Sequence, residues 1–551
     1  MIDINKNQKK ITLSLFSIFF LIGLFTFKDY GISVDEEHHR FAGFYWLNYI
    51  LSFTSFEELK GIVAVKLEAI KGFTLPSPKD HPYYGALFDL VAGFLEVTLK
   101  IEDSKNIFHF KHLLNFITFF IGAIFFYKLL LNRFSNYSVV IIGTLFFILS
   151  PRIYGSGFFN MKDIIFLSLT IISLFYCFKY WDNKNYKNLL IFTFFAAFTT
   201  SHRILGIFLP TSFIIFYLLS ALSNKKDLNY LKHIILFTFF YILFVIIFWP
   251  LLWSGPIDNF ILAFKYFSDH FMKIQMLFNG EYVYTNILPY KYIFVWILIT
   301  TPALYLIFFV IGYIQIFKSF FLKFSNIGDN KYLYDLWENN NEKKDLFILF
   351  CITTIILYFI SFNIVLYTGW RQIYFVNIFI IYIATYAFYR IDIYLKLKNK
   401  NKLLYGVVII FLIFVISKMI IYHPYQNIYF NSLLNKKNIH ENFEVDYWGL
   451  SGKRFLEEIL ILEKSKDMIK IGVASYLPLE RSLKLIDQKD RKKIVIVGQD
   501  FQSADYLYSN FTSEVDKYSN DKYKIPSNFI KVNEFVVDNI KVYEAFKKRN
   551  N

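Results

Sequence analysis

Charged residues are scarce in this sequence. Asp, Glu, Lys and Arg make up 19% of its 551 residues, whereas soluble domains contain about 25%. Hydrophobic residues make up 56% of the sequence, and its mean hydropathy is +0.40. The cores of soluble domains of this total length cannot bury so many apolar side chains. The composition therefore excludes a wholly soluble enzyme and predicts a chain that uses lipid as part of its solvent.

Cysteines and glycine-rich loops are also lacking. The two cysteines, Cys177 and Cys351, both lie in apolar runs, so neither a disulfide framework nor a cysteine zinc site is indicated. No glycine-rich phosphate loop occurs in the polar C-terminal part, so no nucleotide site is predicted there. The net charge is +16, and most of the basic excess flanks apolar runs. Phosphate at a membrane surface is therefore favoured over nucleic acid as a partner.

Long apolar runs dominate the first 421 residues. A membrane helix needs about 20 such residues. Runs of this character lie near 11–28, 111–131, 137–150, 163–180, 188–200, 204–222, 233–250, 293–317, 346–362, 371–389 and 403–421. Two of them, 137–150 and 188–200, are short for a complete span. The sequence predicts a mainly α, polytopic membrane domain of about eleven transmembrane helices over residues 1–421.

Basic loops predict the orientation of this domain. Segments 223–232 and 390–402 are rich in lysine, and basic loops remain in the cytoplasm. If the N-terminus is cytoplasmic and the spans alternate, both segments fall on the inner side. The protein is then expected in the cytoplasmic (inner) membrane as a multi-pass protein, with everything after residue 421 outside the cytoplasm.

The composition changes from Tyr422 onward. Residues 422–551 contain 21 Lys and Arg against 18 Asp and Glu, a mixture typical of a soluble surface. Strand-like runs at 469–476 and 492–498 accompany a helix-like segment at 453–464. We therefore expect a small extracytoplasmic α/β domain over 422–551.

Charged residues near the predicted outer ends of the helices carry the functional signal. They occur in GISVDEEHHRF at 31–41, SPKDHPYYGAL at 77–87, SPRIYGSGFFNMKD at 150–163, SHR at 201–203 and YTGWRQ at 367–372. Each has an ordinary explanation by itself, such as a solvated loop start, a helix-initiating Asp163 or a snorkelling arginine. Together they would surround one outer cavity. Basic groups there suit a phosphate, and carboxylates suit a divalent metal or a general base.

These motifs resemble the GT-C glycosyltransferases, in particular the protein mannosyltransferase and aminoarabinose-transferase branch. The resemblance extends over about residues 1–250 by motif and to residue 421 by topology. It implies an enzyme that transfers a sugar from a polyprenyl-phosphate donor at the outer face of the membrane. Two features depart from the branch: Asn-Met-Lys-Asp stands at 160–163, where a proline is common before the lysine, and Glu37 adds a third acid after the first helix.

The resemblance also implies roles for individual residues. Asp35 matches the catalytic carboxylate, with Glu36 beside it as the second predicted catalytic residue. Asp163 matches an acid that helps to hold a divalent metal in some members. Together with the charge pattern, it predicts a donor phosphate site formed by Lys79, His81, Arg152, Lys162, Arg203 and Arg371. A metal ion on Asp35 and Asp163 remains an open alternative, with Mg, Mn and Zn not distinguished.

The implied reaction is a single displacement at C1 of the sugar with inversion. The acceptor is a hydroxyl of a glycan, a lipid or a protein, activated by Asp35, and membrane lipids are the other partners. Two alternatives remain at this stage. A polysaccharide polymerase or ligase also uses outer loops and arginines, but it need not place an Asp-Glu pair directly after its first helix. A transporter or flippase of lipid-linked sugars would favour a site near the middle of the membrane and internal repeats, and no repeat is visible.

Overall fold

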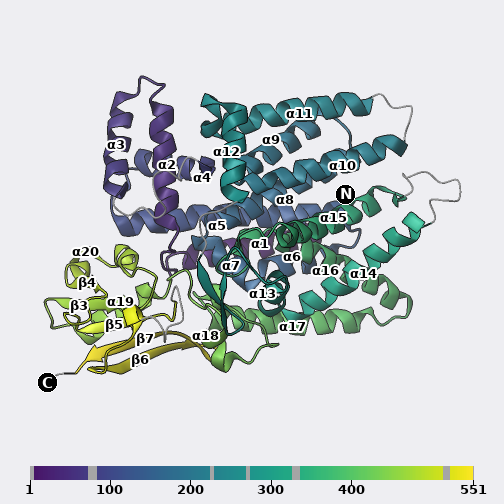
Figure 1. Ribbon diagram of the computed structural model, residues 1–551. Coiled ribbons are helices and arrows are strands. Elements are labelled where there is room, and N and C mark those ends of the chain that lie inside the picture. The colour runs from purple at the N-terminus through teal and green to yellow at the C-terminus, as the bar shows by residue number, and fades with distance from the viewer. Residues whose placement is uncertain are drawn as a thin grey trace.

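The computed structural model describes residues 5–71, 83–223, 229–268, 274–325, 336–512 and 521–549. Long helices run side by side and form a bundle (Figure 1). At one end of the bundle, shorter helices lie across the long ones, and a small sheet packs beside them. We call the end that carries this sheet the site end.

Nine helices of the described residues are long and apolar enough to cross a membrane. They are α1 (Lys6–Thr26), α5 (Ser104–Arg133), α8 (Asp163–Asp182), α10 (Phe208–Ser223) with the preceding 3-10 turn η2 (Ile204–Ile207), α11 (Asn229–Phe248), α14 (Ala303–Ser325), α15 (Asn340–Ser361), α16 (Val376–Leu397) and α17 (Asn401–Ile421). The two short runs form α6 (Tyr137–Ile148) and α9 (Tyr186–His202). All eleven predicted runs are thus helical in whole or in large part, and the polytopic, mainly α fold is confirmed.

Prolines interrupt the helical chain at two of the predicted spans. The run 293–317 consists of α13 (Tyr292–Thr300) and α14, with Pro302 between them. Proline has no amide hydrogen to donate and cannot continue the preceding helix. A second break lies after α6, where Pro151 starts α7 (Pro151–Phe159) at an angle of 59° to α6. The predicted single helix over 293–317 is therefore wrong.

The predicted span 371–389 begins later than its hydropathy suggests. Its helix, α16, starts at Val376, and Arg371 lies instead on the 3-10 turn η5 (Arg371–Ile373). Thr368 and Gly369, just before this turn, have φ angles of 52° and 79°. Glycine tolerates this left-handed conformation, which reverses the chain before the helix. Arg371 is therefore placed on a turn at the site end.

Short elements at the site end come mainly from the chain between α1 and α5, which is the first outer segment in the predicted orientation. These are α2 (Glu36–Leu51), α3 (Glu57–Lys71) and α4 (Leu87–Thr98). The chain between α11 and α13 adds the 3-10 turn η3 (Pro250–Ser254), α12 (Pro256–Ser268) and the hairpin of β1 (Gln275–Phe278) and β2 (Glu281–Tyr284). Helix α2 was not expected, since its start reads as a solvated loop. In the structure most of α2 is buried.

The C-terminal part forms the expected α/β unit. Helix α19 (Gly452–Leu462), β3 (Ile469–Val473) and β4 (Ile494–Gly498) occupy the three predicted segments. The sheet has the order β4-β3-β5-β7-β6, in which β3 is parallel to β4 and β5. The remaining strands of this sheet are β5 (Tyr506–Ser509), β6 (Phe529–Val537) and β7 (Ile540–Lys548). The C-terminal part also contains α18 (Ile439–Asn442), α20 (Gln488–Arg491) and the 3-10 turns η6 (Gln426–Ile428), η7 (Lys436–Asn438), η8 (Glu480–Leu485) and η9 (Asp521–Tyr523). The boundary at residue 422 stays a prediction.

The two ends of the bundle carry different charged residues, as the alternation of spans predicts. Arg133 at the end of α5 forms an ion pair with Asp345 near the start of α15, and Lys344 forms one with Asp182 at the end of α8. These contacts join helix termini at the end opposite the site. The residues directly after α1 contact the C-terminal domain at the site end, where Lys453 donates to the Lys28 carbonyl and Arg481 donates to the Val34 carbonyl.

We expect the site end to face away from the cytoplasm, because the lysine-rich loops lie at the other end of the spans. A reporter that is active only in the cytoplasm, fused after Asn551, should remain silent. The same reporter inserted in the loop after α16, near Asn399, should be active and serves as the control. Activity at Asn551 together with silence near Asn399 would reverse the orientation.

Candidate active site

The three consecutive acids after α1 enter three different environments. Asp35 directly precedes α2, and its carboxylate accepts a hydrogen bond of 2.6 Å from Arg371 Nη1. Glu36 is fully buried, with Oε2 lying 3.1 Å from Nε2 of His112. Glu37 pairs with two basic residues of the C-terminal domain. Asp35, whose side chain is 34% exposed, is the one acid of the three that contacts Arg371.

Asp163 lies at the start of α8 and faces the same group. The Asn160 side chain makes two hydrogen bonds to Asp163. It donates to Asp163 Oδ2 at 2.9 Å and accepts from the Asp163 backbone amide at 3.0 Å. Arg203, at the end of α9, donates to Asp163 Oδ1 and also to the carbonyl of Gln372. With a side chain only 2% exposed, Asp163 is a buried carboxylate neutralised by an arginine.

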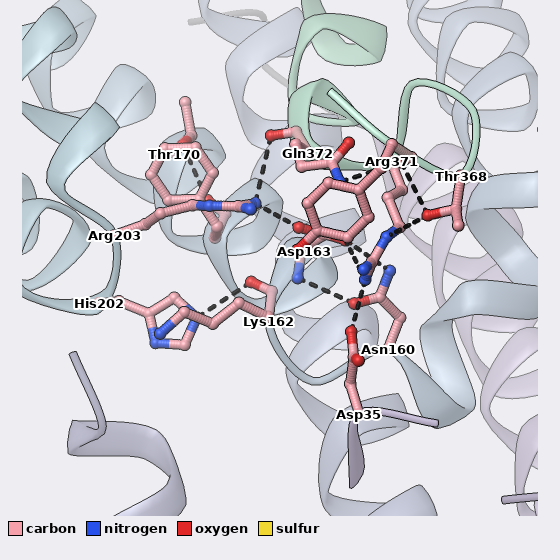
Figure 2. A network of polar contacts seen from close by, with 12 residues as sticks. Asp35, Asn160, Lys162, Asp163, Thr170, His202, Arg203, Thr368, Arg371 and Gln372 are labelled. Carbon is pink, nitrogen blue, oxygen red and sulfur yellow. Dashed lines mark hydrogen bonds and ion pairs between the residues drawn. The ribbon is translucent and has the colours of Figure 1, made fainter. Parts of the chain in front are cut away.

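Arg371 connects the two carboxylates. Its Nη1 lies 2.6 Å from Asp35 Oδ2 and 3.9 Å from Asp163 Oδ2. The guanidinium packs against the rings of Tyr367 and Trp448, at 4.7 and 4.5 Å from their centroids. Figure 2 shows Asp163 from the start of α8, Arg203 from the end of α9 and Arg371 from the η5 turn pointing toward one another. Segments far apart in the sequence therefore form one network of two acids and two arginines.

The electrostatics keep Asp35 ionised. Burial alone would raise the pKa of Asp35, but the Arg371 guanidinium, with a smaller contribution from His39, outweighs burial and lowers this pKa to about 2. A carboxylate in this state is able to accept a proton or to bind a cation.

Lys162 lies at the other side of the network, just before α8. Its Nζ donates to the carbonyl of Gly85 at 2.5 Å, and its own carbonyl lies 3.0 Å from His202 Nε2. Gly85 is required here, since a Cβ would lie 1.6 Å from the carbonyl oxygen of Ser201. Burial lowers the pKa of Lys162 to about 8, against the opposing charge of Asp89. Lys162 is thus a buried cation that loses its charge close to neutral pH.

We expect donor binding to weaken as Lys162 loses its proton. Above its pKa, the ammonium becomes neutral, and at one pH unit above it roughly a tenth stays charged. For the polyprenyl-phosphate donor that the sequence motifs imply, kcat/KM should therefore fall about tenfold between pH 7 and pH 9. The variant Lys162→Arg should keep its charge and lose this decline. An identical decline in both proteins would assign the titration to another group.

A cavity of about 500 Å³ extends from Lys162 and Arg203 into the bundle. Most of its wall is apolar and comes from α10, α12 and α15, including Phe208, Ile215, Phe264, Phe267, Phe350 and Phe359. Its polar end is formed by Tyr84, Lys162, His202, Arg203 and Gln372. A second cavity of about 570 Å³, at the opposite end, is lined by Arg133 and Asp345 and by none of the predicted site residues.

Among the predicted phosphate-binding residues that the structure describes, Arg152 is not in this network. Arg152 is buried between α7 and the chain after α17, where its Nε donates to the Tyr429 carbonyl at 2.9 Å. Its guanidinium packs against Trp296 and Phe430, at 5.3 and 4.6 Å from the ring centroids. Arg152 therefore packs in the wall between these elements. Lys79 and His81 lie outside the described residues, so their predicted role is untested.

Several residues of the network were not identified from the sequence. They are Asn160, Thr368, Gln372 and Trp448. The first three are close in sequence to predicted site residues, and their amide and hydroxyl groups were an available signal. Trp448 stands in FEVDYWGLSGKR, far along the chain, and no local signal connects it with Arg371.

The two acids do not fit a metal site as they are placed. A guanidinium nitrogen of Arg371 contacts Asp35 and approaches Asp163, so a cation already lies between them. Within the described residues, no group of three or more His, Cys, Asp or Glu side chains is arranged to hold a metal ion. Divalent cations such as Mg²⁺ and Ca²⁺ generally need six or more oxygen ligands, some of them water.

We expect added EDTA to leave turnover unchanged, because Arg371 supplies the positive charge between Asp35 and Asp163. Purified protein should be dialysed against the chelator and assayed with and without added Mg²⁺, Mn²⁺ or Zn²⁺. Loss of turnover that one of these ions restores would instead support the metal alternative.

Comparison with known proteins finds similarity in solved structures. Neither models of protein families nor curated proteins give a significant match. A crystal structure of ArnT from Cupriavidus metallidurans in the apo state matches with a TM-score of 0.47 and 11% identity, over 98% of both chains. The chain resembles ArnT in its fold. The same protein bound to undecaprenyl phosphate matches with a TM-score of 0.41 and 10% identity, over 82% of this chain and 87% of the other.

Both TM-scores lie below 0.5, and a likeness this distant carries no information about the function of this chain.

Proposed function

We propose that the protein is an inverting glycosyltransferase that takes a sugar from a polyprenyl-phosphate donor and transfers it to an acceptor hydroxyl at the outer face of the cytoplasmic membrane. The acceptor is a glycan, a lipid or a protein. One observation carries the proposal: an apolar cavity ends at Lys162 and Arg203, and Arg203 pairs with Asp163, which Arg371 connects to the Asp35 carboxylate.

The cavity suits a lipid phosphate in both of its parts. An isoprenoid chain is apolar and matches the aromatic and aliphatic wall between α10, α12 and α15. A phosphate carries negative charge and oxygen acceptors, which match Lys162 and the planar fork of Arg203. The long axis of such a donor would thus run from the bundle toward the site end, with its phosphate next to the network.

The chemistry follows from the charges around the phosphate. The acceptor oxygen forms a bond to C1 of the sugar while the bond from C1 to the phosphate oxygen breaks. The acceptor proton passes to Asp35, and the departing polyprenyl phosphate takes the bonding electrons. Lys162 and Arg203 stabilise the charge that develops on the phosphate, so no second protonated carboxylate is required.

Arg371 has a further role in this scheme. In the structure it donates to Asp35, which holds the Asp35 pKa low and makes the carboxylate a weak base. A donor phosphate would compete for the same guanidinium. Asp35 would then become more basic only when donor is bound, which couples proton abstraction to the presence of substrate.

The location of the network supports a transferase over a transporter. Asp35, Asp163, Arg203 and Arg371 lie at helix ends or on turns, whereas a transporter is expected to bind its substrate near the middle of the membrane.

Incubation of the purified protein with radiolabelled polyprenyl-phosphate sugars tests the proposal most directly. A panel of hexose and pentose donors should include one that is consumed, with release of polyprenyl phosphate and inversion at C1. Nucleotide sugars serve as the control and should remain intact. If no polyprenyl-phosphate sugar is consumed in the presence of membrane extract as acceptor source, the proposed function is wrong.

A further inference from the structure

The C-terminal domain contacts the segment that carries Asp35. Glu37, two residues further along, has a side chain only 3% exposed. Lys484 contacts its Oε1, and Nε of Arg481 lies 3.4 Å from its Oε2. Both basic residues belong to the η8 turn of the C-terminal domain. A buried glutamate of the first outer segment is therefore neutralised by a domain about 440 residues away in sequence.

The backbone of the same segment is held by the same domain. The amide of Val34, which directly precedes Asp35, donates to the carbonyl of Trp448 at 3.1 Å. The carbonyl of Val34 accepts a hydrogen bond from Arg481 Nη1. Both polar backbone groups of this residue are thus bonded to the C-terminal part, which restricts the peptide plane adjacent to Asp35.

Close packing accompanies these polar contacts. A Cβ on Gly31 would lie 2.3 Å from the Leu450 carbonyl oxygen, so only glycine allows the two chains to approach this closely. Ile32, Phe108 and Leu485 form a small buried cluster that joins the first outer segment, α5 and η8. The η8 turn is therefore anchored to the bundle as well as to the segment that it holds.

The topology of the sheet accounts for the position of the η8 turn. Strand β3 lies between β4 and β5 and runs parallel to both. The chain leaves β3 toward β4 on one side and later reaches β5 on the other side. In open α/β sheets, such a reversal opens the loops at the carboxyl ends of the strands, where functional residues commonly lie. Here the loop after β3 supplies Arg481 and Lys484.

Trp448 links this contact with the partner of Asp35. Its carbonyl holds Val34, and its ring packs 4.5 Å from the Arg371 guanidinium. Arg371 in turn donates to Asp35. One residue of the C-terminal part thus contacts the segment before the carboxylate and the arginine that faces the carboxylate.

We propose that Arg481 and Lys484 are positioning residues that hold residues 33–37 in place and keep the Asp35 carboxylate directed at Arg371. The C-terminal domain is then part of the catalytic machinery. This inference rests on the proposed function, because it assigns the contact a purpose in the reaction of Asp35.

Two variants test the inference. In Arg481→Gln and Lys484→Gln, kcat should fall roughly tenfold, since a displacement of 1 Å at a reacting group costs up to about 100-fold. KM for the donor should change little, because neither residue lines the donor cavity. The matched control is Lys489→Gln, an exposed lysine of the same domain, which should behave like the unmodified protein.

A charge exchange separates positioning from loss of folding. Glu37→Lys and Lys484→Glu should each lower kcat, and the two together should recover part of it, because the ion pair is restored in reverse. If the ion pair contributed only to folding, the single variants would lower the amount of folded protein and leave the kcat of the folded protein unchanged. Equal kcat in all variants, or no recovery in the combined variant, would overturn the inference.

Hydrogen exchange gives a readout that does not depend on activity. In Arg481→Gln, the amides of residues 31–37 should exchange faster, while those of α8 should be unchanged. If the unmodified protein transfers no sugar, the proposed function fails although this contact is still measured. If it transfers sugar and Arg481→Gln keeps full kcat despite faster exchange, the inference fails while the proposed function stands.

Discussion

The Asp35→Asn variant should insert and fold normally while its turnover falls by roughly 100-fold or more, the usual scale for loss of a general base. Asparagine keeps the size of the side chain and still accepts a hydrogen bond from Arg371, but it has no charge and takes no proton. Donor binding should change far less than turnover, because Asp35 does not line the donor cavity. Single-turnover rates with the donor identified in the panel experiment, together with donor affinity, measure the two effects separately.

The neighbouring acids provide matched controls for Asp35. Glu36 is fully buried and accepts a hydrogen bond from the Ser33 amide at 2.7 Å. Glu36→Gln should therefore lower the free energy of unfolding by about 1–3 kcal/mol. The turnover of the protein that remains folded should change little. Glu37→Gln should show the roughly tenfold loss expected from a displaced segment. Near-normal turnover in Asp35→Asn with abolished turnover in Glu36→Gln would move the base to Glu36. Full activity in all three variants would refute the mechanism.

Replacement of Arg371 should have the second largest effect. Arg371→Ala removes the cation between Asp35 and Asp163 and takes one donor from the phosphate, and a loss of about 100- to 1000-fold in kcat/KM is expected for one such group. Arg371→Lys keeps the charge but loses the planar fork, so it should restore only part of the activity. Donor affinity and kcat, measured for both variants, show whether binding or turnover is affected.

The control for Arg371 is an arginine at the opposite end of the bundle. Arg390 lies near the end of α16 and is exposed, so Arg390→Ala should leave kcat/KM unchanged. Thermal unfolding of each variant shows whether a loss of activity comes from a loss of folded protein. Unchanged donor affinity and turnover in Arg371→Ala would return this residue to the role of an arginine that merely reaches the membrane surface.

Hydropathy and loop charge were sufficient to predict the membrane helices of this protein and the alternation of their connections. All eleven apolar runs are helical in whole or in large part, because the cost of placing polar groups in lipid is a local property of each stretch of sequence. The alternation of spans also explains why Asp35, Asp163, Arg203 and Arg371 meet. Connections that follow every second helix lie on the same side of the membrane, so motifs separated by hundreds of residues gather at one end.

The order of side chains within each motif could not be predicted in the same way. Successive residues at the start of a helix point about 100° apart, so one extra acid is enough to leave the register open. Neighbouring elements decided the matter: His112 on α5 takes Glu36, the η8 turn takes Glu37, and Arg371 is left to Asp35. These partners come from distant parts of the chain, and their proximity depends on packing.

The sequence by itself determined that this is a polytopic membrane protein with a polar C-terminal α/β domain, and it identified most of the charged residues that meet at one end. Tertiary structure alone decided that Arg152 packs against aromatic rings away from the network, that Arg371 connects both carboxylates, and that Trp448 packs on that arginine. Hydropathy and motif spacing describe residues along the chain. The partner of a buried charge is whichever opposite charge the folded chain brings within reach, and desolvation makes that choice energetically important.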